Sequence, residues 1–469
     1  MLEYLFPAGF LIAAFLGAWV VILVSVGSLQ MARRFPDGLL HYYFYAVLFS
    51  NCLAIFLSTR SFAEAGETIQ EGLTTNPLAA WAIRLTSLFA LLASADLITR
   101  YLGPSRRIGG IRAFLAIVFG FFWVTNIVVP ALFSPHTMPF QLNWFYSLVL
   151  GMGMIFMVAS GATLSIRHCR NAIFVFCAVS LLLIPIRPDL VMQSDYTQGY
   201  LPGIPRFAGL APHAIVMGMN AALGLWCLMA YPMASRTLNR LCWLIGLSAL
   251  FLAQSKTVWF SFLVSLPVML YCQHGLPSWQ SLTASRHRSL FALLGSLTLL
   301  GITMVTAIIF FGDIGSRLEH FLGSSEGAQV MSLTGRDQIW AVALSEWDRS
   351  PIVGYGLPLF GPEHQAQIGM KFATSGHNQM IDSLGRAGTV GAVGTLLYAL
   401  SLLWLGLRFG RSSRGLSAAL AISIVIRMIS EVPITLGNIG IDSLPYYLLL
   451  AVIAAHLGKP DSRGATTHA

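Results

Sequence analysis

The residues best suited to chemistry in this 469-residue chain lie in one polar stretch between two long hydrophobic blocks, Gly312 to Gly385. The stretch contains the runs LTGRDQIW, GYG and SGHNQMID. His377 stands where SGHNQMID opens a predicted helix, and the helix dipole there disfavours a charged imidazolium. A neutral imidazole can accept a proton near pH 7, so His377 is the candidate general base. A lone histidine could instead only cap the helix, but the adjacent Asn378 and nearby cations favour a functional role.

These residues must be positioned by membrane helices. Hydrophobic residues make up 56% of the chain and charged residues 10%, and the mean hydropathy is +0.71, which excludes a soluble globular domain. Apolar runs long enough to cross a bilayer recur, as at Leu5 to Met31, Ile111 to Phe133 and Leu290 to Phe311. We predict an all-α polytopic membrane protein of about 12–13 transmembrane helices. Residues 1–469 form a single membrane domain, and residues 312–387 form one large loop with short helices.

The first apolar run and the six cysteines could suggest a signal peptide and a disulfide or zinc site, and we predict neither. The first apolar run is too long for the apolar part of a signal peptide and has no basic segment before it, so we predict that it is retained as a helix. The six cysteines are scattered without paired spacing, so they suggest neither a disulfide framework nor a zinc site.

Basic residues in the short loops predict the orientation. These loops contain Arg33 and Arg34, Arg106 and Arg107, Arg167 and Arg170, Arg236 and Arg240, Arg286 and Arg288, and Arg408, Arg411 and Arg414. By the positive-inside rule they face the cytoplasm, and the large polar loop and the N-terminus face outward. The alternation requires that Leu241 to Ala253 and Val258 to Cys272 be two short helices joined by an outward QSKT turn. The net charge of +9 then anchors the protein to anionic lipid, and no nucleic acid partner is implied.

A minority of basic residues falls on the outward side, where few are expected. They are Arg187, Arg206, Lys256, Arg336, Lys371 and Arg386. Each could snorkel from a helix end or pair with a nearby acid such as Asp189, Asp195 or Asp337. Taken together, cations that converge at one membrane face suit a ligand with a doubly charged phosphate group.

Within the polar loop, Thr334 and Asp337 resemble a capping box that opens an amphipathic helix on the membrane surface. Arg336 then lies in the first turn, where free backbone N–H groups also favour an anion. A pair with Glu346 or Asp348 is the alternative for Arg336. The GYG run lacks the GK[ST] ending of a phosphate-binding loop and is predicted to position its neighbours.

Asp382, Glu431 and Asp96, the last on the third apolar run near the cytoplasmic side, have less direct interpretations. Asp382 could orient His377, although a spacing of five residues along a helix is poor for direct contact. Arg427 and Glu431 lie four residues apart in an apolar run, as do Asp96 and Arg100, and each pair is predicted to be structural.

The order of the motifs resembles the O-antigen ligase and polymerase superfamily of bacterial envelope enzymes. The resemblance rests on SLTGRDQIW, the following GxG and the GHN at the head of a helix. Upstream, RFAGLAPHAIVMGMN is similar to the family's entry to a middle helix, through Arg206, Gly209 and His213. QSKTVWF is similar to its outward turn, with Lys256 where many members have arginine, which keeps the charge but not bidentate geometry. The N-terminal half matches only in hydropathy.

Members of this superfamily transfer an oligosaccharide from an undecaprenyl pyrophosphate carrier to an acceptor on the outer side of the cytoplasmic membrane. The resemblance implies an inverting glycosyltransferase of the inner membrane whose site faces the periplasm. It implies His377 as the catalytic base and a set of residues that bind substrate or pyrophosphate: Arg206, Lys256, Arg336, Arg187, His213 and Asn378. No DxD carboxylate motif occurs, so neither a metal nor another cofactor is expected.

The acceptor separates two activities, because a ligase uses lipid A core and a polymerase uses another lipid-linked repeat unit. QSKT resembles the turn of exopolysaccharide polymerases, which slightly favours the polymerase. The implied partners are the lipid-linked donor, a glycan or lipid A core acceptor, the lipid bilayer and polysaccharide-assembly proteins. The alternative of another class is a polysaccharide or anion transporter or flippase, in which Arg427 and Glu431 would gate a path. Such a protein would show internal repeats, and the sequence contains none that we find.

Overall fold

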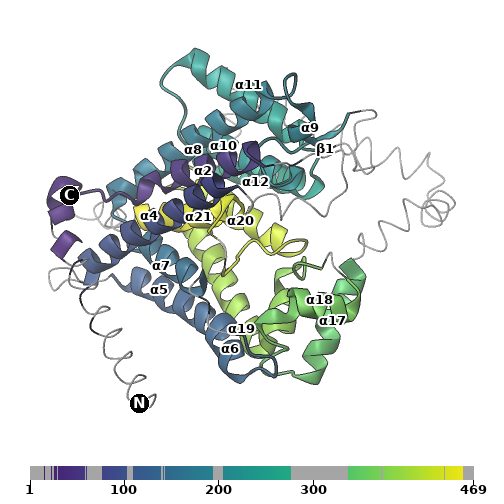
Figure 1. The fold of residues 1–469 in the computed structure, drawn as a ribbon. Coiled ribbons are helices and arrows are strands. Elements are labelled where there is room, and N and C mark those ends of the chain that lie inside the picture. Colours follow the sequence, from purple (N-terminus) through teal and green to yellow (C-terminus); the bar gives the residue numbers. More distant parts are fainter. Residues whose placement is uncertain are drawn as a thin grey trace.

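The computed structural model describes residues 30–58, 60, 76–102, 109–138, 141, 143–193, 204–275, 336–370, 373–437 and 439–457, with residues 15, 19, 23 and 26–28 of the first helix. Most of the predicted span Leu5 to Met31 lies outside the described residues. So do the predicted span Leu290 to Phe311 and the part of the large loop before Arg336. The described chain is almost entirely helical (Figure 1), which confirms the all-α prediction.

The helices before the QSKT turn are α2 (Tyr43–Phe56), which follows the short η1 (Leu40–Tyr42), α4 (Pro77–Leu102), α5 (Gly110–Trp123) continued by the π-helical η2 (Val124–Val128) and α6 (Val129–Phe133), α7 (Asn143–Ile155), α8 (Ala159–Leu182), α9 (Pro188–Val191), α10 (Ala214–Ala230) and α11 (Arg236–Leu252). Those after it are α12 (Lys256–His274), α17 (Arg336–Arg349), η4 (Leu357–Phe360), α18 (Pro362–Ile368), α19 (Gln379–Arg408), α20 (Leu416–Met428), η5 (Ile441–Ser443) and α21 (Leu444–His456). Strands β1 (Met192–Gln193) and β2 (Arg206–Phe207) form one antiparallel pair.

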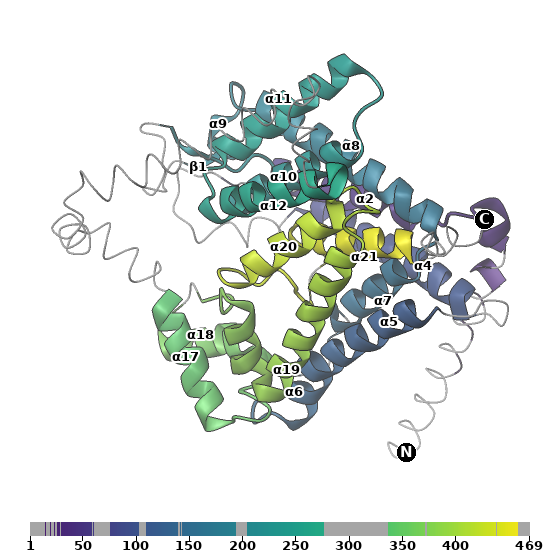
Figure 2. The same ribbon diagram turned by 180° about the vertical axis from the view of Figure 1, so that it is seen from behind.

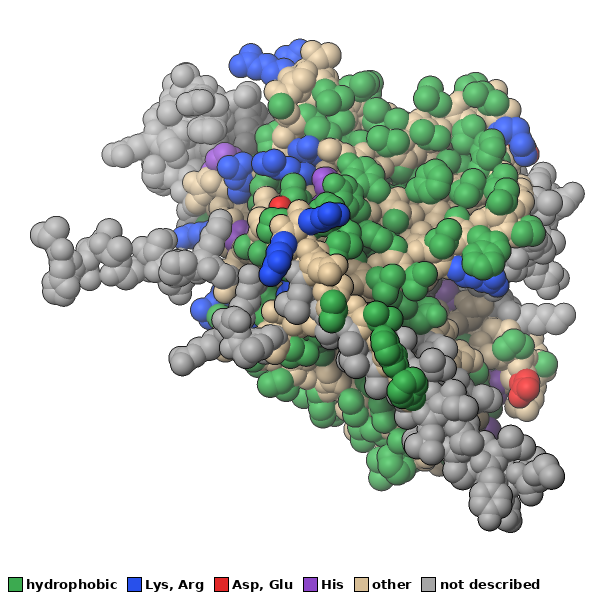
Figure 3. Space-filling model, turned by 60° about the vertical axis from the view of Figure 1, so that its left-hand side comes forward, with side chains coloured by type: hydrophobic (Ala, Val, Ile, Leu, Met, Phe, Trp, Pro, Cys, Tyr) green, Lys and Arg blue, Asp and Glu red, His purple; other side chains and the backbone are tan. Residues whose placement is uncertain are grey.

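Four described helices are long and apolar enough to cross a membrane: α4, α5 with its continuation to Phe133, α8 and α19. Shorter apolar helices pack against them: α10 and α21 contact α8, and α20 contacts α19. Large apolar side chains lie on the outside of the protein. For example, Ile117 is 69% exposed and Leu244 is 65% exposed. Hydrophobic side chains cover most of the face seen in Figure 3. A soluble protein would not expose so many, so this surface is suited to lipid.

The described helices run alternately between two ends of the molecule. At one end, Arg100 donates to the Phe35 carbonyl (2.8 Å) and Arg414 donates to the Ala230 carbonyl (3.3 Å). We call it the basic end, because it gathers the described arginines of the loops used to predict orientation. The opposite end, called the site end, holds the starts of α10, α12, α19 and α21. Helices α17 and α18 project from the bundle beside the start of α19 (Figures 1 and 2).

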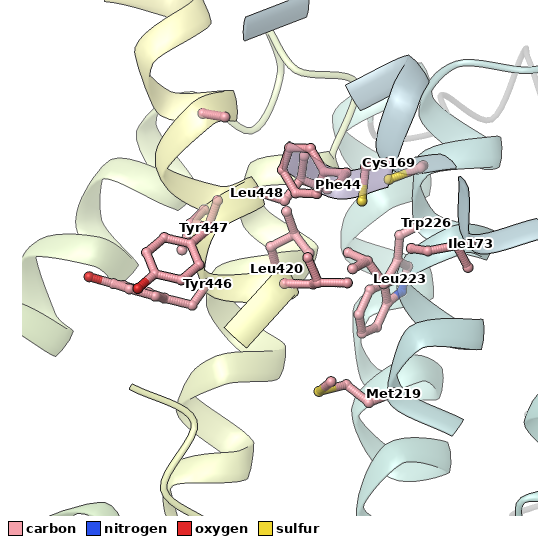
Figure 4. Close-up of a cluster of buried hydrophobic side chains, with 14 of the residues drawn as sticks. Phe44, Cys169, Ile173, Met219, Leu223, Trp226, Leu420, Tyr446, Tyr447 and Leu448 are labelled. Atoms are coloured by element: carbon pink, nitrogen blue, oxygen red, sulfur yellow. The ribbon is translucent and has the colours of Figure 1, made fainter. Parts of the chain in front are cut away.

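The core lies where α2, α8, α10, α20 and α21 meet. Phe44, Ile173, Trp226, Leu420 and Tyr447 are all buried there (Figure 4). Some polar groups inside this core pair with each other: the Trp226 indole donates to the Ser265 hydroxyl at 2.7 Å, and the Tyr398 and Tyr446 hydroxyls lie 2.7 Å apart. The Tyr447 hydroxyl has no hydrogen-bond partner among the described residues. Helix α21, buried on every side, is held in the middle of the bundle and places the residues before it at the site end.

Helices α11 and α12 confirm the predicted helix pair around the QSKT turn. Short helices such as α20 end before a full membrane thickness, because a helix of 13 residues is only about 20 Å long. Segments without helix follow or precede these helices: 204–213, which includes β2, 253–255, and 429–437 with 439–440. Non-helical backbone at membrane depth is tolerated where it is buried in protein or lines a water-filled space. These breaks converge at the site end and bring polar side chains there.

The GYG run positions α17 against α19, as the sequence predicts. Tyr355 N–H donates to the Gly385 carbonyl (2.8 Å) and Gly356 N–H to the Arg386 carbonyl (3.1 Å). Gly388 makes this approach possible, since its φ is +64° and a Cβ there would lie 2.3 Å from the Ile352 carbonyl oxygen. It also separates the first turns of α19 from the long span that follows.

Arg60 fastens the loop that carries Arg206 and His213. Its buried guanidinium donates to the carbonyls of Leu190 (2.5 Å), Ala211 (2.6 Å) and Gly209 (2.7 Å). Burial lowers the pKa of Arg60 to about 9, so the side chain is still charged at neutral pH. The planar fork of five donors in a guanidinium suits contact with several carbonyls at once.

Replacing Arg60 with alanine is expected to destabilise the protein by about 2 kcal/mol or more, because buried carbonyls lose their donors. The measurement is the thermal unfolding of the purified protein in detergent. Arg84→Ala is the matched control, since Arg84 is exposed on α4. Equal unfolding temperatures for the two variants would contradict this role for Arg60.

Candidate functional site

The head of α19 is organised by Asn378. Its side-chain oxygen accepts hydrogen bonds from the backbone N–H of Met380 (2.9 Å) and Ile381 (3.1 Å), so Asn378 is the N-cap. His377 therefore precedes the helix instead of lying in its first turn as predicted. Its φ is +44°, a left-handed conformation that is unfavourable for a residue with a Cβ. This backbone turns the His377 ring toward Glu431.

Glu431 holds two of the predicted site residues together. Its Oε1 lies 3.2 Å from Nη2 of Arg336, and its Oε2 lies 3.8 Å from Nδ1 of His377. The three side chains keep 20–28% of their surface exposed, so a substrate can reach them. A separation of 3.8 Å is too long for a hydrogen bond, and Nδ1 of His377 has no hydrogen-bond partner among the described residues. The ring is therefore held close to a carboxylate and is still able to exchange a proton.

The charge state of Glu431 follows from its neighbours. Burial alone would raise the pKa of Glu431, but the contact with His377 and the charges of Arg336 and Arg427 outweigh burial and lower the pKa below its usual value. Glu431 is thus a carboxylate at neutral pH.

The segment after α20 is docked onto the head of α19. The amide of Asn378 donates to the Ile429 carbonyl (3.1 Å). Gln379 both donates to the Ile434 carbonyl (3.3 Å) and accepts from the Ile434 N–H (3.0 Å). These bonds bracket Glu431 from both sides along the chain. Asn378, predicted to bind substrate, thus has both polar groups engaged in positioning His377 and Glu431.

Arg206 and His213 approach the same cluster from the other side of the bundle. Arg206 is buried in β2 and its Nε donates to the Ala253 carbonyl (3.3 Å), beside the QSKT turn. His213 is the N-cap residue of α10 and is exposed, and it lies within electrostatic range of Asp442, Glu431, Arg206 and Arg427.

Lys256 begins α12 with an exposed side chain. The next residue, Thr257, lies 3.5 Å from Ser430 through their hydroxyls, and Ser430 directly precedes Glu431. The neighbouring Gln254 has a φ of +48°, a second left-handed non-glycine residue at this end of the molecule. The turn thus places a cation next to the Glu431 segment. Arg206, Lys256, Arg336 and Arg427 outnumber the carboxylates Glu431 and Asp442, so this end suits a multiply charged anion.

Residues 241–396 match a protein-family model described as O-antigen ligase. The chain resembles the O-antigen ligases and polymerases. The match covers Lys256, Arg336 and His377 and confirms the resemblance stated from the sequence for this part of the chain. It supports a role of the O-antigen ligase or polymerase type in a membrane. No curated protein matches the chain.

Some predicted site residues lie apart from the cluster within this O-antigen ligase-like protein. Arg187 pairs with Asp189 at 3.1 Å in an exposed position, which was the alternative for it, and no described contact joins it to Glu431. Arg386 pairs with Asp382 at 3.3 Å. Asp382 accepts a hydrogen bond from the Gly376 N–H (2.8 Å), so it supports the loop before His377 and not the imidazole. Lys371 and Thr334 lie outside the described residues.

Two interpretations of charged pairs change. The sequence places Arg427 and Glu431 on one helical face as a structural pair, but α20 ends at Met428 and Glu431 is free to turn toward Arg336 and His377. The alternative partners of Arg336, Glu346 or Asp348, are wrong, since Arg336 pairs with Glu431 at 3.2 Å and Glu346 pairs with Arg349 at 2.6 Å. Asp96 and Arg100 do pair along one helix, as predicted.

Glu431 is the site residue that sequence reasoning missed. The available signal was its position, since an ionisable residue in an apolar run is by default a candidate functional residue. Arg427 and Asp442 carry the same signal and lie near it. Among the described residues, no three His, Cys, Asp or Glu side chains are grouped as metal ligands.

Proposed function

We propose that this protein is a glycosyltransferase that moves oligosaccharide units from an undecaprenyl pyrophosphate carrier at the outer face of the cytoplasmic membrane, with polymerisation of repeat units favoured over ligation. The observation that carries the proposal is the contact of both Arg336 and His377 with Glu431. Arg336 and His377 lie in the region that matches the O-antigen ligase model, and Glu431 follows that region in the chain. The arginines gathered at the basic end support a cytoplasmic orientation for that end, which leaves the site in the periplasm.

In the proposed reaction, His377 is the general base and Glu431 is its partner. With Nδ1 of His377 facing Glu431, Nε2 is left to accept the proton of the acceptor hydroxyl. The acceptor oxygen then forms a bond to the anomeric carbon, and the bond from that carbon to the phosphate oxygen breaks with its electron pair on the pyrophosphate. Attack opposite the leaving group inverts the configuration. The carboxylate of Glu431 stabilises the imidazolium that forms, as the third member of a catalytic triad does.

The leaving pyrophosphate gains charge as the bond breaks, and the site must stabilise it. Arg336, Arg206 and Lys256 are the proposed donors, aided by the first N–H groups of α17 beside Arg336. Arg336 rests against Glu431 in the free protein, and a phosphate with two negative charges would compete for the same guanidinium. No metal is assigned to the reaction in this proposal.

The test is reconstitution of the purified protein in liposomes with a lipid-linked repeat unit, with and without lipid A core. We expect chain growth without the core, because the QSKT turn favours a polymerase. Product that appears only when the core is present would make the protein a ligase. Absence of transfer with either acceptor would contradict the glycosyltransferase, and transport of the lipid-linked unit across the bilayer would then be measured in the same liposomes.

A further inference from the structure

A second cationic site lies at the basic end, away from the residues described above. A cavity of about 440 Å³ there is lined by Arg167, Arg170, Tyr231, Pro232, Ala234 and Arg414. Helix α10 runs from His213 at the site end to Ala230 beside this cavity, and its 17 residues separate the two places by about 25 Å. The cavity therefore cannot be part of the cluster around Glu431.

Neutral oxygens, and not carboxylates, hold Arg170 and Arg414 in this cavity: both donate to backbone carbonyls, and Arg170 also donates to Oδ1 of Asn171 (2.9 and 3.0 Å). Arg170 donates to the carbonyls of Tyr231 and Pro232, the latter at 3.0 Å. Arg414 donates to the Ala230 carbonyl (3.3 Å), and its guanidinium lies 5.8 Å from the centre of the Tyr231 ring. Neutral partners orient a guanidinium without cancelling its charge. The lining of the cavity contains no acidic residue.

Arg167 is the least engaged of the three. It is exposed, and it makes no hydrogen bond or ion pair with any described residue. Arg167 and Arg170 are three residues apart on α8 and thus on one helical face, where like charges repel. Arg414 approaches from another element with a φ of +55°, an unfavourable conformation for arginine. The repulsion among three cations and the conformation of Arg414 both cost free energy. A bound anion would offset that cost, because it attracts all three guanidinium groups.

We propose that this cavity binds a phosphate group at the basic end of the protein. Guanidinium groups offer paired donors that match phosphate oxygens, and three of them can surround one phosphate. Tyr231, Pro232 and Ala234 supply an apolar wall beside the cations, which suits the glycerol and first acyl carbons of a phospholipid. Basic pockets between membrane helices bind lipid head groups in this way. The phosphate can come from a lipid head group or from free phosphate, and the test separates the two.

The experiment uses the purified full-length protein, stripped of lipid in detergent, and measures binding by native mass spectrometry and by thermal unfolding. One arm adds phosphatidylglycerol, with phosphatidylcholine as the zwitterionic comparison, and the other adds inorganic phosphate. We expect phosphatidylglycerol to bind and to raise the unfolding temperature, and Arg167→Gln to weaken that binding on the order of tenfold through the loss of one charge-assisted contact. Because Arg167 is exposed and makes no described contact, its replacement leaves the fold intact.

Arg240→Gln is the matched control, since Arg240 is an exposed arginine on α11 at the same end but does not line the cavity. Arg414→Gln should weaken binding as Arg167→Gln does. Stabilisation by inorganic phosphate that depends on Arg167 would support the site with free phosphate as its ligand. Equal losses for Arg167→Gln and Arg240→Gln would overturn the proposal, because the lipid would then respond only to overall charge. Binding of neither probe would also overturn it.

Discussion

Replacing His377 with alanine is expected to lower the rate of glycosyl transfer by about two to four orders of magnitude, the usual contribution of a general base. The reason is geometric. His377 is held in a left-handed backbone conformation by the Asn378 cap, and its ring lies 3.8 Å from a carboxylate that can stabilise the protonated form. The measurement is the initial rate of transfer in the reconstituted liposomes, with the donor in excess.

His274→Ala is the control for this loss, because His274 is an exposed histidine at the far end of α12. It should transfer at the wild-type rate. Wild-type turnover in His377→Ala would remove the base from the proposal and leave only a positioning role.

Replacing Arg336 with alanine is expected to cost about two to three orders of magnitude in rate, comparable with the loss of a donor to a developing negative charge. The effect should be larger on kcat than on KM, because the charge on the leaving pyrophosphate grows in the transition state. Arg336→Lys should recover only part of the rate, since a single ammonium cannot reproduce the planar fork of a guanidinium.

Arg349→Ala is the matched control on the same helix. Arg349 ends α17, its side chain is 73% exposed, and it pairs with Glu346 instead of Glu431. If Arg336→Ala raises KM and leaves kcat unchanged, Arg336 only holds the donor. Equal effects of Arg336→Ala and Arg349→Ala would argue against a specific role for Arg336.

Local pattern was sufficient for many of the elements. The apolar run Ile111 to Phe133 predicted the span that the structure forms from Gly110 to Phe133. Helices α11 and α12 flank the QSKT turn where two short helices were expected. Arg336 opens α17 as its motif indicated, and GYG pairs with the chain at Gly385 and Arg386 as a positioning element. These features are set by residues that lie close together in the sequence, so composition and spacing are sufficient to predict them.

The site needed information that spacing does not contain. The sequence paired Glu431 with Arg427 because it extended one helix through both, whereas α20 ends at Met428 and the following segment docks on Asn378 and Gln379. It grouped Arg187 with the other outward cations, whereas the structure leaves Arg187 with Asp189. Hydropathy measures whether a segment is apolar and not where a helix stops inside the protein.

The sequence by itself determined the membrane class, the order of the motifs and the residue types available for chemistry, because these follow from apolar run length, basic loops and local capping. Only the tertiary structure decided which charges meet. Arg336, His377 and Glu431 come from three segments, and they meet because short helices end within the bundle and their irregular continuations must satisfy backbone groups against one another.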